Sequence, residues 1–198
     1  MTVPISTYRI QFHKGFTFKD FNKILPYLHK LGVDTIYASP IFKAIPGSTH
    51  GYDVTCPLEI NPEIGTEEEL FAIAAELKKL GMKWLQDIVP NHMSFHPHNT
   101  WLMDVLKNGK KSVYSNYFDI DFSAADGRLM VPFLGQSLAE AIEDKSIQIT
   151  EKENEFYIVT GDDFWPVNSA TTKALAKANL SAINSSAESL QRIAESQY

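Results

Sequence analysis

Two segments of this chain share the order helix, Lys-Leu-Gly, strand, and this order favours a parallel sheet. A Lys-Leu-Gly sequence lies at 30–32 before the β-rich segment 33–38, and again at 79–81 before the segment 82–89. Alternating polar and apolar residues over 7–12 predict one more strand before the first helix. The order strand–helix–strand–helix–strand implies right-handed crossovers between parallel strands. We therefore predict an α/β fold.

Both predicted helices carry start and stop signals. A threonine with an acidic residue three positions later, at 17–20 and at 66–69, has the spacing of a capping box. Apolar residues then recur at helical spacing over 18–31 and 70–80, and a glycine follows each segment. We expect the helices to begin and end at these signals.

Polar residues follow the second and third predicted strands. After the second strand we predict a single long loop over 39–53, which contains His-Gly-Tyr-Asp at 50–53. The third strand ends near Asp87, and Asn91 and His92 follow it. The carboxyl ends of parallel strands meet at one edge of the sheet, where α/β proteins bind their ligands. We therefore expect both segments to lie at one site.

The residue types in these segments suit a ligand with many hydroxyl groups. The carboxylate of Asp87 needs a partner at a buried strand end, Asn91 and His92 offer donors, and Tyr52 offers a flat face for a sugar ring. The alternative is structural. Asp87 would then cap loop amides, His92 would be a satisfied loop histidine and Tyr52 would pack under its loop. The spacing leaves both interpretations open.

Other kinds of site lack the residues that they need. His92, His96 and His98 lie downstream of Asp87, but no Glu or Cys completes a familiar zinc pattern, and we predict no metal site. The sequence has no Gly-x-Ser-x-Gly elbow and no Gly-rich phosphate loop. We expect no cofactor.

Composition narrows the class of protein. The chain has 24 acidic and 18 basic residues and a net charge of −6, which argues against nucleic-acid binding. Its single cysteine, Cys56, cannot form an internal disulfide bond. No stretch approaches the length of about 18 apolar residues that a membrane span needs, and no leader-like segment begins the chain. We expect a cytoplasmic protein without membrane contact.

The spacing of the predicted elements changes after His92. The elements expected there are short: a helix over 101–107, an irregular or strand-like segment over 116–122, a hairpin with a Glu-Asn turn over 147–160, and helices over 170–198 with a break at 184–186. We therefore divide the chain into residues 1–93 and residues 94–198, the latter an excursion from the parallel sheet.

Several motifs together resemble one family. Asp87-x-x-x-Asn91-His92 matches the first conserved region of the α-amylase superfamily, and His-Gly-Tyr at 50–52 matches that superfamily's loop after the second strand. Longer segments, in their order and spacing, resemble the maltooligosyltrehalose synthases: 6–12, 37–41, 46–54 and 87–93, with a looser likeness at 117–121 and 163–166. The resemblance extends over residues 6–168.

The resemblance implies a (β/α)8 TIM barrel, in which 1–93 holds the first three βα units and 94–198 is a subdomain inserted after strand 3. The family converts the reducing-end α-1,4 bond of a maltooligosaccharide into an α,α-1,1 bond in trehalose biosynthesis. The resemblance also implies that Tyr52 stacks on the sugar beside the cleaved bond. His50 and His92 are expected to hydrogen-bond the hydroxyl groups of that sugar. Four more residues are expected to organise or extend this substrate site: Arg9, Asp53, Asp87 and Asn91.

The sequence lacks the segments that carry the family's chemistry. Retaining glycosidases use two carboxylates about 5–5.5 Å apart, and neither the family's Gly-x-Arg-x-Asp segment nor its following Glu segment occurs. We expect no catalytic residue in this chain, no turnover by the chain alone, and a longer parent enzyme. Two alternative interpretations stay open. The chain could be a fragment of an α-amylase-type hydrolase, or it could be a non-catalytic glucan-binding module. Three strands cannot close a barrel, so we also expect self-association through open sheet edges or a marginal fold, unless residues 94–198 fold back over the open side.

Overall fold

The computed structural model describes residues 3–124 and 129–197. The chain divides into two compact units, which we call unit 1 (Met1–Ser94) and unit 2 (Phe95–Tyr198). Each unit has its own core of buried apolar side chains. The boundary lies close to the predicted division at 93, and the interpretation of 94–198 as an inserted subdomain stays a prediction.

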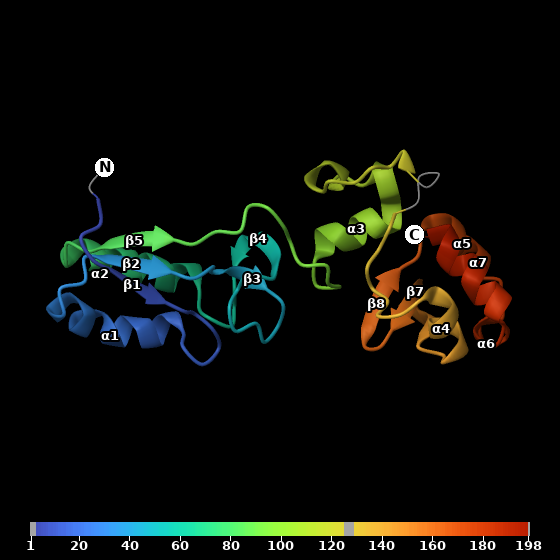
Figure 1. The fold of residues 1–198 in the computed structure, drawn as a ribbon, viewed down its shortest axis with the longest axis horizontal. Helices are drawn as coiled ribbons and strands as arrows, with labels where there is room; N and C mark the ends of the chain where they lie inside the picture. The colour runs from blue at the N-terminus through green and yellow to red at the C-terminus, as the bar shows by residue number, and fades with distance from the viewer. Residues whose placement is uncertain (1–2, 125–128, 198) are drawn as a thin grey trace. The chain divides into compact units, whose positions relative to one another are not determined.

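Unit 1 is built on parallel strands. β1 (Thr7–Ile10), β2 (Thr35–Ala38) and β5 (Lys83–Gln86) pair in the order β1-β2-β5. Figure 1 shows these strands side by side with α1 (Phe18–Lys30) alongside them, and α2 (Glu67–Lys79) precedes β5 in the chain. The predicted parallel α/β arrangement is confirmed, although β5 is shorter than the predicted strand.

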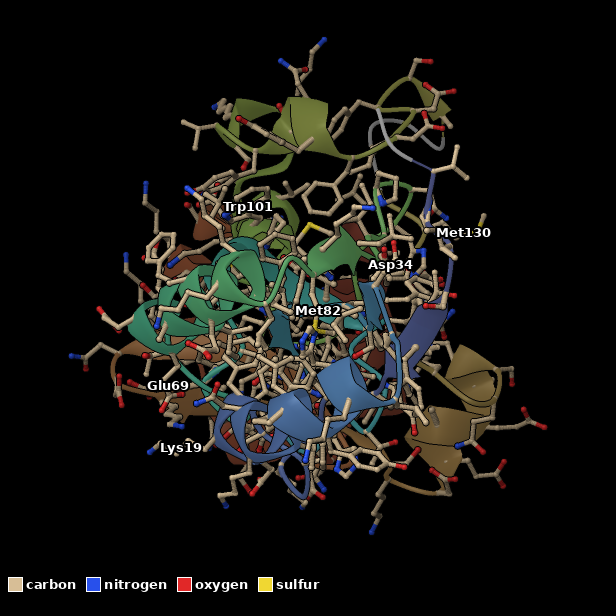
Figure 2. The ribbon with its side chains drawn as sticks, turned by 90° about the vertical axis from the view of Figure 1, so that its left-hand side faces the viewer. Lys19, Asp34, Glu69, Met82, Trp101 and Met130 are labelled. Atoms are coloured by element: carbon tan, nitrogen blue, oxygen red, sulfur yellow. The ribbon has the colours of Figure 1, made fainter. Side chains whose placement is uncertain are left out.

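Both helices of unit 1 begin at the predicted capping boxes. The Thr17 hydroxyl accepts from the Asp20 N–H, and the Asp20 carboxylate accepts from the Thr17 N–H. Thr66 and Glu69 repeat this arrangement at the start of α2. Lys19 Nζ lies 3.4 Å from Glu69 Oε1 and links the starts of the two helices, as Figure 2 shows. These contacts fix the residue at which each helix begins.

The strands of unit 1 direct alternate side chains to opposite faces of the sheet. Ile36 and Trp84 belong to the core that the helices cover. Arg9, Tyr37 and Leu85 stand one position away and are aligned with one another by the strand register. They therefore share the opposite face of the sheet, where Arg9 and Tyr37 place polar groups.

The predicted single loop over 39–53 is wrong. β3 (Phe42–Ala44) lies inside it and pairs antiparallel with β4 (Val54–Ile60), with register shifts on both sides of Lys43. β3 has three residues and β4 contains Pro57, which lacks a ladder donor, so neither segment has a clear strand signal. The hairpin holds the ends of the 45–53 segment close together, since Ile45 N–H donates to Asp53 O at 3.1 Å.

Unit 2 packs short helices on an antiparallel sheet. Its strands pair in the order β6-β7-β8. In chain order its elements are α3 (Thr100–Asn108), η1 (Gly109–Lys111), η2 (Ser115–Tyr117), α4 (Leu138–Glu143), β6 (Ile147–Lys152), β7 (Glu155–Thr160), β8 (Asp163–Pro166), α5 (Ser169–Leu175), α6 (Leu180–Asn184) and α7 (Ala187–Gln197).

Most predicted elements of unit 2 are confirmed. The helix over 101–107 is α3, and the hairpin with its Glu-Asn turn is β6 and β7. The break at 184–186 separates α6 from α7, but a further break between α5 and α6 was not predicted. The short α4 and β8 were also missed. Within the described residues, no helix combines the length and apolar composition that crossing a bilayer requires.

Candidate functional site

Four side chains of unit 1 meet at the carboxyl ends of its parallel strands. Arg9 Nη1 donates to Asp87 Oδ2 at 3.1 Å, and Arg9 Nη2 donates to the Tyr52 hydroxyl at 2.9 Å. The hydroxyl groups of Tyr52 and Tyr37 both donate to Asp87 Oδ2, that of Tyr37 at 3.2 Å. We call these residues the Asp87 cluster.

The strand register explains why these residues meet. Arg9 and Tyr37 are partners in adjacent strands, and the Arg9 guanidinium lies 4.5 Å from the centre of the Tyr37 ring. Tyr37 is the partner of Leu85, and Asp87 follows Leu85 by two positions, so it returns to the same face. The Asp87 N–H also donates to Ala38 O at 2.9 Å, which extends the ladder beyond β5.

The Asp87 cluster fixes the protonation of its members. The hydrogen bond from Tyr52, with further donation from Arg9 and Tyr37, lowers the pKa of the Asp87 carboxyl group against the opposing effect of its burial. The hydrogen bond to Asp87, together with burial, raises the pKa of the Tyr52 phenol. Asp87 is therefore a carboxylate near neutral pH, and Tyr52 keeps the proton that it donates.

The loop that carries His50 is held by Gln11. Gln11 Nε2 donates to Thr49 O at 3.2 Å and to His50 O at 3.1 Å. Gly51 has φ +74°, and a Cβ there would lie 2.7 Å from Pro40 O. This position therefore needs glycine. The backbone at this glycine fixes the positions of the two neighbouring side chains.

The hydrogen bonds of His50 select its tautomer. Its Nδ1 accepts from the Tyr52 N–H at 3.0 Å, so the neutral ring carries its proton on Nε2. Asp53 Oδ1 lies 3.8 Å from His50 Nδ1 and accepts from the Ser48 hydroxyl at 2.5 Å. The ring of His50 is exposed and its Nε2–H is a donor, whereas Asp53 is used within the loop.

His92 is joined to the same loop. The Asn91 side-chain amide lies 3.1 Å from His92 Nδ1, and His92 Nε2 lies 3.2 Å from Tyr52 O. With Asn91 as donor, the His92 ring carries its proton on Nε2 and donates to that carbonyl. In this structure both ring nitrogens of His92 are engaged within the site, and His92 steadies the backbone of Tyr52. Its hydrogen bond to a sugar hydroxyl stays a prediction, and that contact would have to replace one of these two.

Hydrogen bonds or close polar contacts thus connect all seven predicted site residues within unit 1: Arg9, His50, Tyr52, Asp53, Asp87, Asn91 and His92. Sequence reasoning missed Tyr37 and Gln11, which hold Asp87 and the His50 loop. The signal for Tyr37 was present, because strand periodicity places it on the face of Arg9.

The rival metal site finds no support in the described part of the chain, where no group of three or more His, Cys, Asp or Glu side chains could hold a metal ion. His96 and His98 lie together, with 3.1 Å between their Nδ1 atoms. His92 instead contacts Asn91 and the Tyr52 backbone.

Comparison with known proteins identifies the family. The model of the α-amylase catalytic domain matches residues 17–178, which is more than half of the chain. The chain belongs to the α-amylase family. Its fold accordingly matches the N-terminal part of TIM-barrel enzymes of that family.

Individual members of the α-amylase family are more specific. A putative maltooligosyl trehalose synthase of Mycobacterium tuberculosis is 46% identical over 138 residues, 66% of this chain and 18% of that protein. A solved glycosyltrehalose synthase is 43% identical over 87% of this chain and 23% of its own, with a TM-score of 0.77. The maltooligosyltrehalose synthase from Arthrobacter ramosus is 37% identical over 85% of this chain and 22% of its own, with a TM-score of 0.75.

These similarities confirm the predicted resemblance to the trehalose-forming synthases of the α-amylase family. They extend over both units, since the structural matches cover 85–87% of the chain. The chain spans only about a fifth of the length of these relatives.

Proposed function

We propose that unit 1 supplies the glucan-binding residues of a maltooligosyltrehalose synthase, and that β1, β2 and β5 are the first strands of its (β/α)8 barrel. The reaction is the family's conversion of a reducing-end α-1,4 bond into an α,α-1,1 bond. The observation that carries this proposal is the Asp87 cluster, which ties Tyr52 to the ends of all three strands. The similarity to named synthases supports the choice of substrate.

Binding and orientation are the tasks of the residues in unit 1. The ring of Tyr52 offers an apolar face to the sugar ring, while its hydroxyl is held by Asp87 and Arg9. His50 donates from Nε2 to a sugar hydroxyl, because its Nδ1 is occupied by the Tyr52 N–H. His92 fixes the Tyr52 backbone. A rigid aromatic platform of this kind loses little conformational entropy when it binds a sugar.

Holding the sugar is central to a transfer reaction. In the proposed synthase, the α-1,4 bond to the reducing-end glucose breaks, glucose leaves, and the remaining maltooligosyl group becomes bonded to a carboxylate nucleophile. The bond to the carboxylate then breaks as the maltooligosyl group joins the anomeric hydroxyl of the released glucose. The released glucose must stay oriented while water is kept out, since water would otherwise accept the maltooligosyl group. We propose that the Tyr52 platform belongs to this holding function and that the reacting carboxylates lie on other segments of the enzyme.

Titration of the 198-residue chain with maltopentaose tests the binding role. We expect amide NMR signals of 49–53 and 87–92 to shift on titration, and Tyr52→Ala to weaken this binding by about tenfold through loss of the ring contact. Tyr27→Ala is the matched control, since Tyr27 is 63% exposed and lies on α1. No shift at 49–53 and 87–92 in the wild-type chain would overturn the proposal.

Turnover is measured in the same samples. We expect the chain alone to form no trehalose end from maltopentaose, because none of its residues is proposed to act as nucleophile or general acid. Loss of reducing ends without hydrolysis, catalysed by the purified chain, would show that this division of roles is wrong.

A further inference from the structure

A cleft of about 410 Å³ lies within unit 2, between α3 and the outer face of β7 and β8. Its volume falls within the range of about 300–1,000 Å³ that ligand pockets occupy. The residues that carry the argument are Asp104 and Lys107 from α3, Glu155 and Tyr157 from β7, and Phe164 from β8. None of them belongs to the Asp87 cluster.

Strand alternation places aromatic rings in this cleft. Phe156, Ile158 and Trp165 point into the core of unit 2. Tyr157 and Phe164 therefore belong to the outer face, where their ring centres are 6.0 Å apart and their planes nearly perpendicular. Phe164 is 37% exposed, although an apolar side chain of this size gains from burial. The Lys152 ammonium lies 5.4 Å from the centre of the Phe164 ring, so this partly exposed aromatic surface carries a cation beside it.

Charged groups border these rings. Lys107 Nζ lies 2.9 Å from Glu155 Oε1, across the cleft from helix to strand. Asp104 accepts from the Asn108 side-chain amide at 2.8 Å and from the Ser112 hydroxyl, so its carboxylate is fixed in place. Donors and acceptors are therefore both present beside the aromatic surface, and their charges are of mixed sign.

This combination selects the chemistry of the ligand. A purely apolar ligand would strip water from Lys107, Glu155 and Asp104 and leave their remaining hydrogen-bonding capacity unused. A strongly charged ligand of either sign would meet a like charge at the rim. A sugar satisfies both requirements, because its C–H faces pack on aromatic rings and its hydroxyl groups donate to carboxylates and accept from ammonium groups.

We propose that this cleft is a binding site for α-1,4-linked glucan in unit 2, in addition to the residues proposed for unit 1. The sugar class follows from the cleft itself. The α-1,4 linkage rests on the proposed function, since it takes the substrate of the related synthases as the glucan at hand.

Titration of the full chain with maltoheptaose, followed by amide NMR signals, tests the two sites separately. We expect shifts at 100–107 and 155–166, which report on the cleft, besides those at 49–53 and 87–92. Shifts confined to unit 1 would overturn this inference and leave the proposed function standing. Shifts confined to the cleft would support the inference and count against the proposed function, and shifts at neither would overturn both.

Variants test the cleft directly. We expect Phe164→Ala to weaken binding at the cleft by about fivefold, as expected for partial loss of an aromatic contact, without affecting the unit 1 signals. Lys107→Met leaves both rings in place and should weaken binding at the cleft by about threefold. This variant tests the cleft even when Phe164→Ala fails to fold. Tyr117→Ala, an exposed tyrosine outside the cleft lining, should have no effect. Equal affinity for cellohexaose, or unchanged binding in both variants, would contradict the proposal.

Discussion

Asp87 stands at a strand end where a carboxylate is tolerated only because several donors meet it. Arg9, Tyr37 and Tyr52 all donate to its Oδ2, and its side chain is 16% exposed. Hydrogen bonds that involve a charged partner contribute more to stability than neutral ones. The cluster therefore serves the stability of unit 1 and the position of Tyr52 together.

Asp87→Asn should lower the free energy of unfolding of unit 1 by about 1–2 kcal/mol, because it keeps the shape of the side chain but removes the charge opposite Arg9. Urea unfolding followed by hydrogen exchange of the β1, β2 and β5 amides measures this loss. Asp162→Asn is the control, since Asp162 is exposed and such a change should stay within about 0.5 kcal/mol. Equal stability of the two variants would show that the charge of Asp87 contributes nothing.

Asp34 gives unit 1 a dependence on pH. Its carboxylate accepts from the Ser6 and Ile5 N–H groups at 3.0 and 3.2 Å and from Lys83 Nζ at 3.1 Å, at the strand ends seen in Figure 2. The backbone hydrogen bond from Ser6 is the largest of the effects that lower the pKa of Asp34 to about 2. The pKa of an aspartate in an unfolded chain is about 3.9.

Because the folded pKa is the lower one, this stabilisation is present above about pH 4 and is lost as the pH falls toward 2. We expect the unfolding midpoint of unit 1 to drop over this interval. In Asp34→Asn the drop should be smaller, and the midpoint at neutral pH should already be lower. Thermal melting at pH 2, 3, 4 and 7 compares the variants. An equal drop in wild type and Asp34→Asn would contradict the assignment.

The residues of the site differ in how much of their role the sequence reveals. Motif spacing located Asp87, His92 and Tyr52, but it could not show that the Tyr52 hydroxyl is bound to Asp87, because that contact depends on the path of the intervening loop. Tyr37 was missed although its strand position places it beside Arg9. Gln11 gave no signal, since it contacts backbone carbonyl groups rather than another motif residue.

At the scale of elements, sequence reasoning succeeded where several local signals agreed. The capping boxes, apolar periodicity and terminal glycines of α1 and α2 all indicate the same bounds. The pairing of β3 with β4 left no such pattern, because β3 is short, its register is irregular and Pro57 lies within β4. The six-residue α4 does have a capping box at Ser137 and Glu140, but it is too short for periodicity to show.

The turn between β6 and β7 can be improved. Glu153 and Asn154 have φ values of +55° and +64°, which two-residue hairpins of type I′ require. Asn tolerates this region, whereas Glu does not favour it. We expect Glu153→Asn to raise the free energy of unfolding of unit 2 by about 0.5–1 kcal/mol, and Asn154→Ala to lower it by about 1 kcal/mol. Urea unfolding checks both, and no difference in sign between them would refute this account.

At the scale of the whole molecule, the sheet of unit 1 presents a problem that its small size creates. Within the described residues, β1 and β5 are the edges of the β1-β2-β5 sheet. Leu85 on β5 is 47% exposed and Tyr8 on β1 is 43% exposed, so neither edge strand carries only charged side chains. A (β/α)8 barrel removes such edges by closing, and these strands cannot close by themselves.

We therefore expect the 198-residue chain to self-associate through the edges of this sheet. Sedimentation velocity should show a weight-average coefficient that rises with protein concentration. Leu85→Lys should reduce the association, because a charged side chain on an edge strand disfavours pairing with a second strand. Phe71→Lys is the matched control, since Phe71 is an exposed apolar residue on α2 and lies outside the sheet. A wild-type chain that stays monomeric over the whole range, or an equal response of the two variants, would show that the open edges do not govern the assembly of this chain.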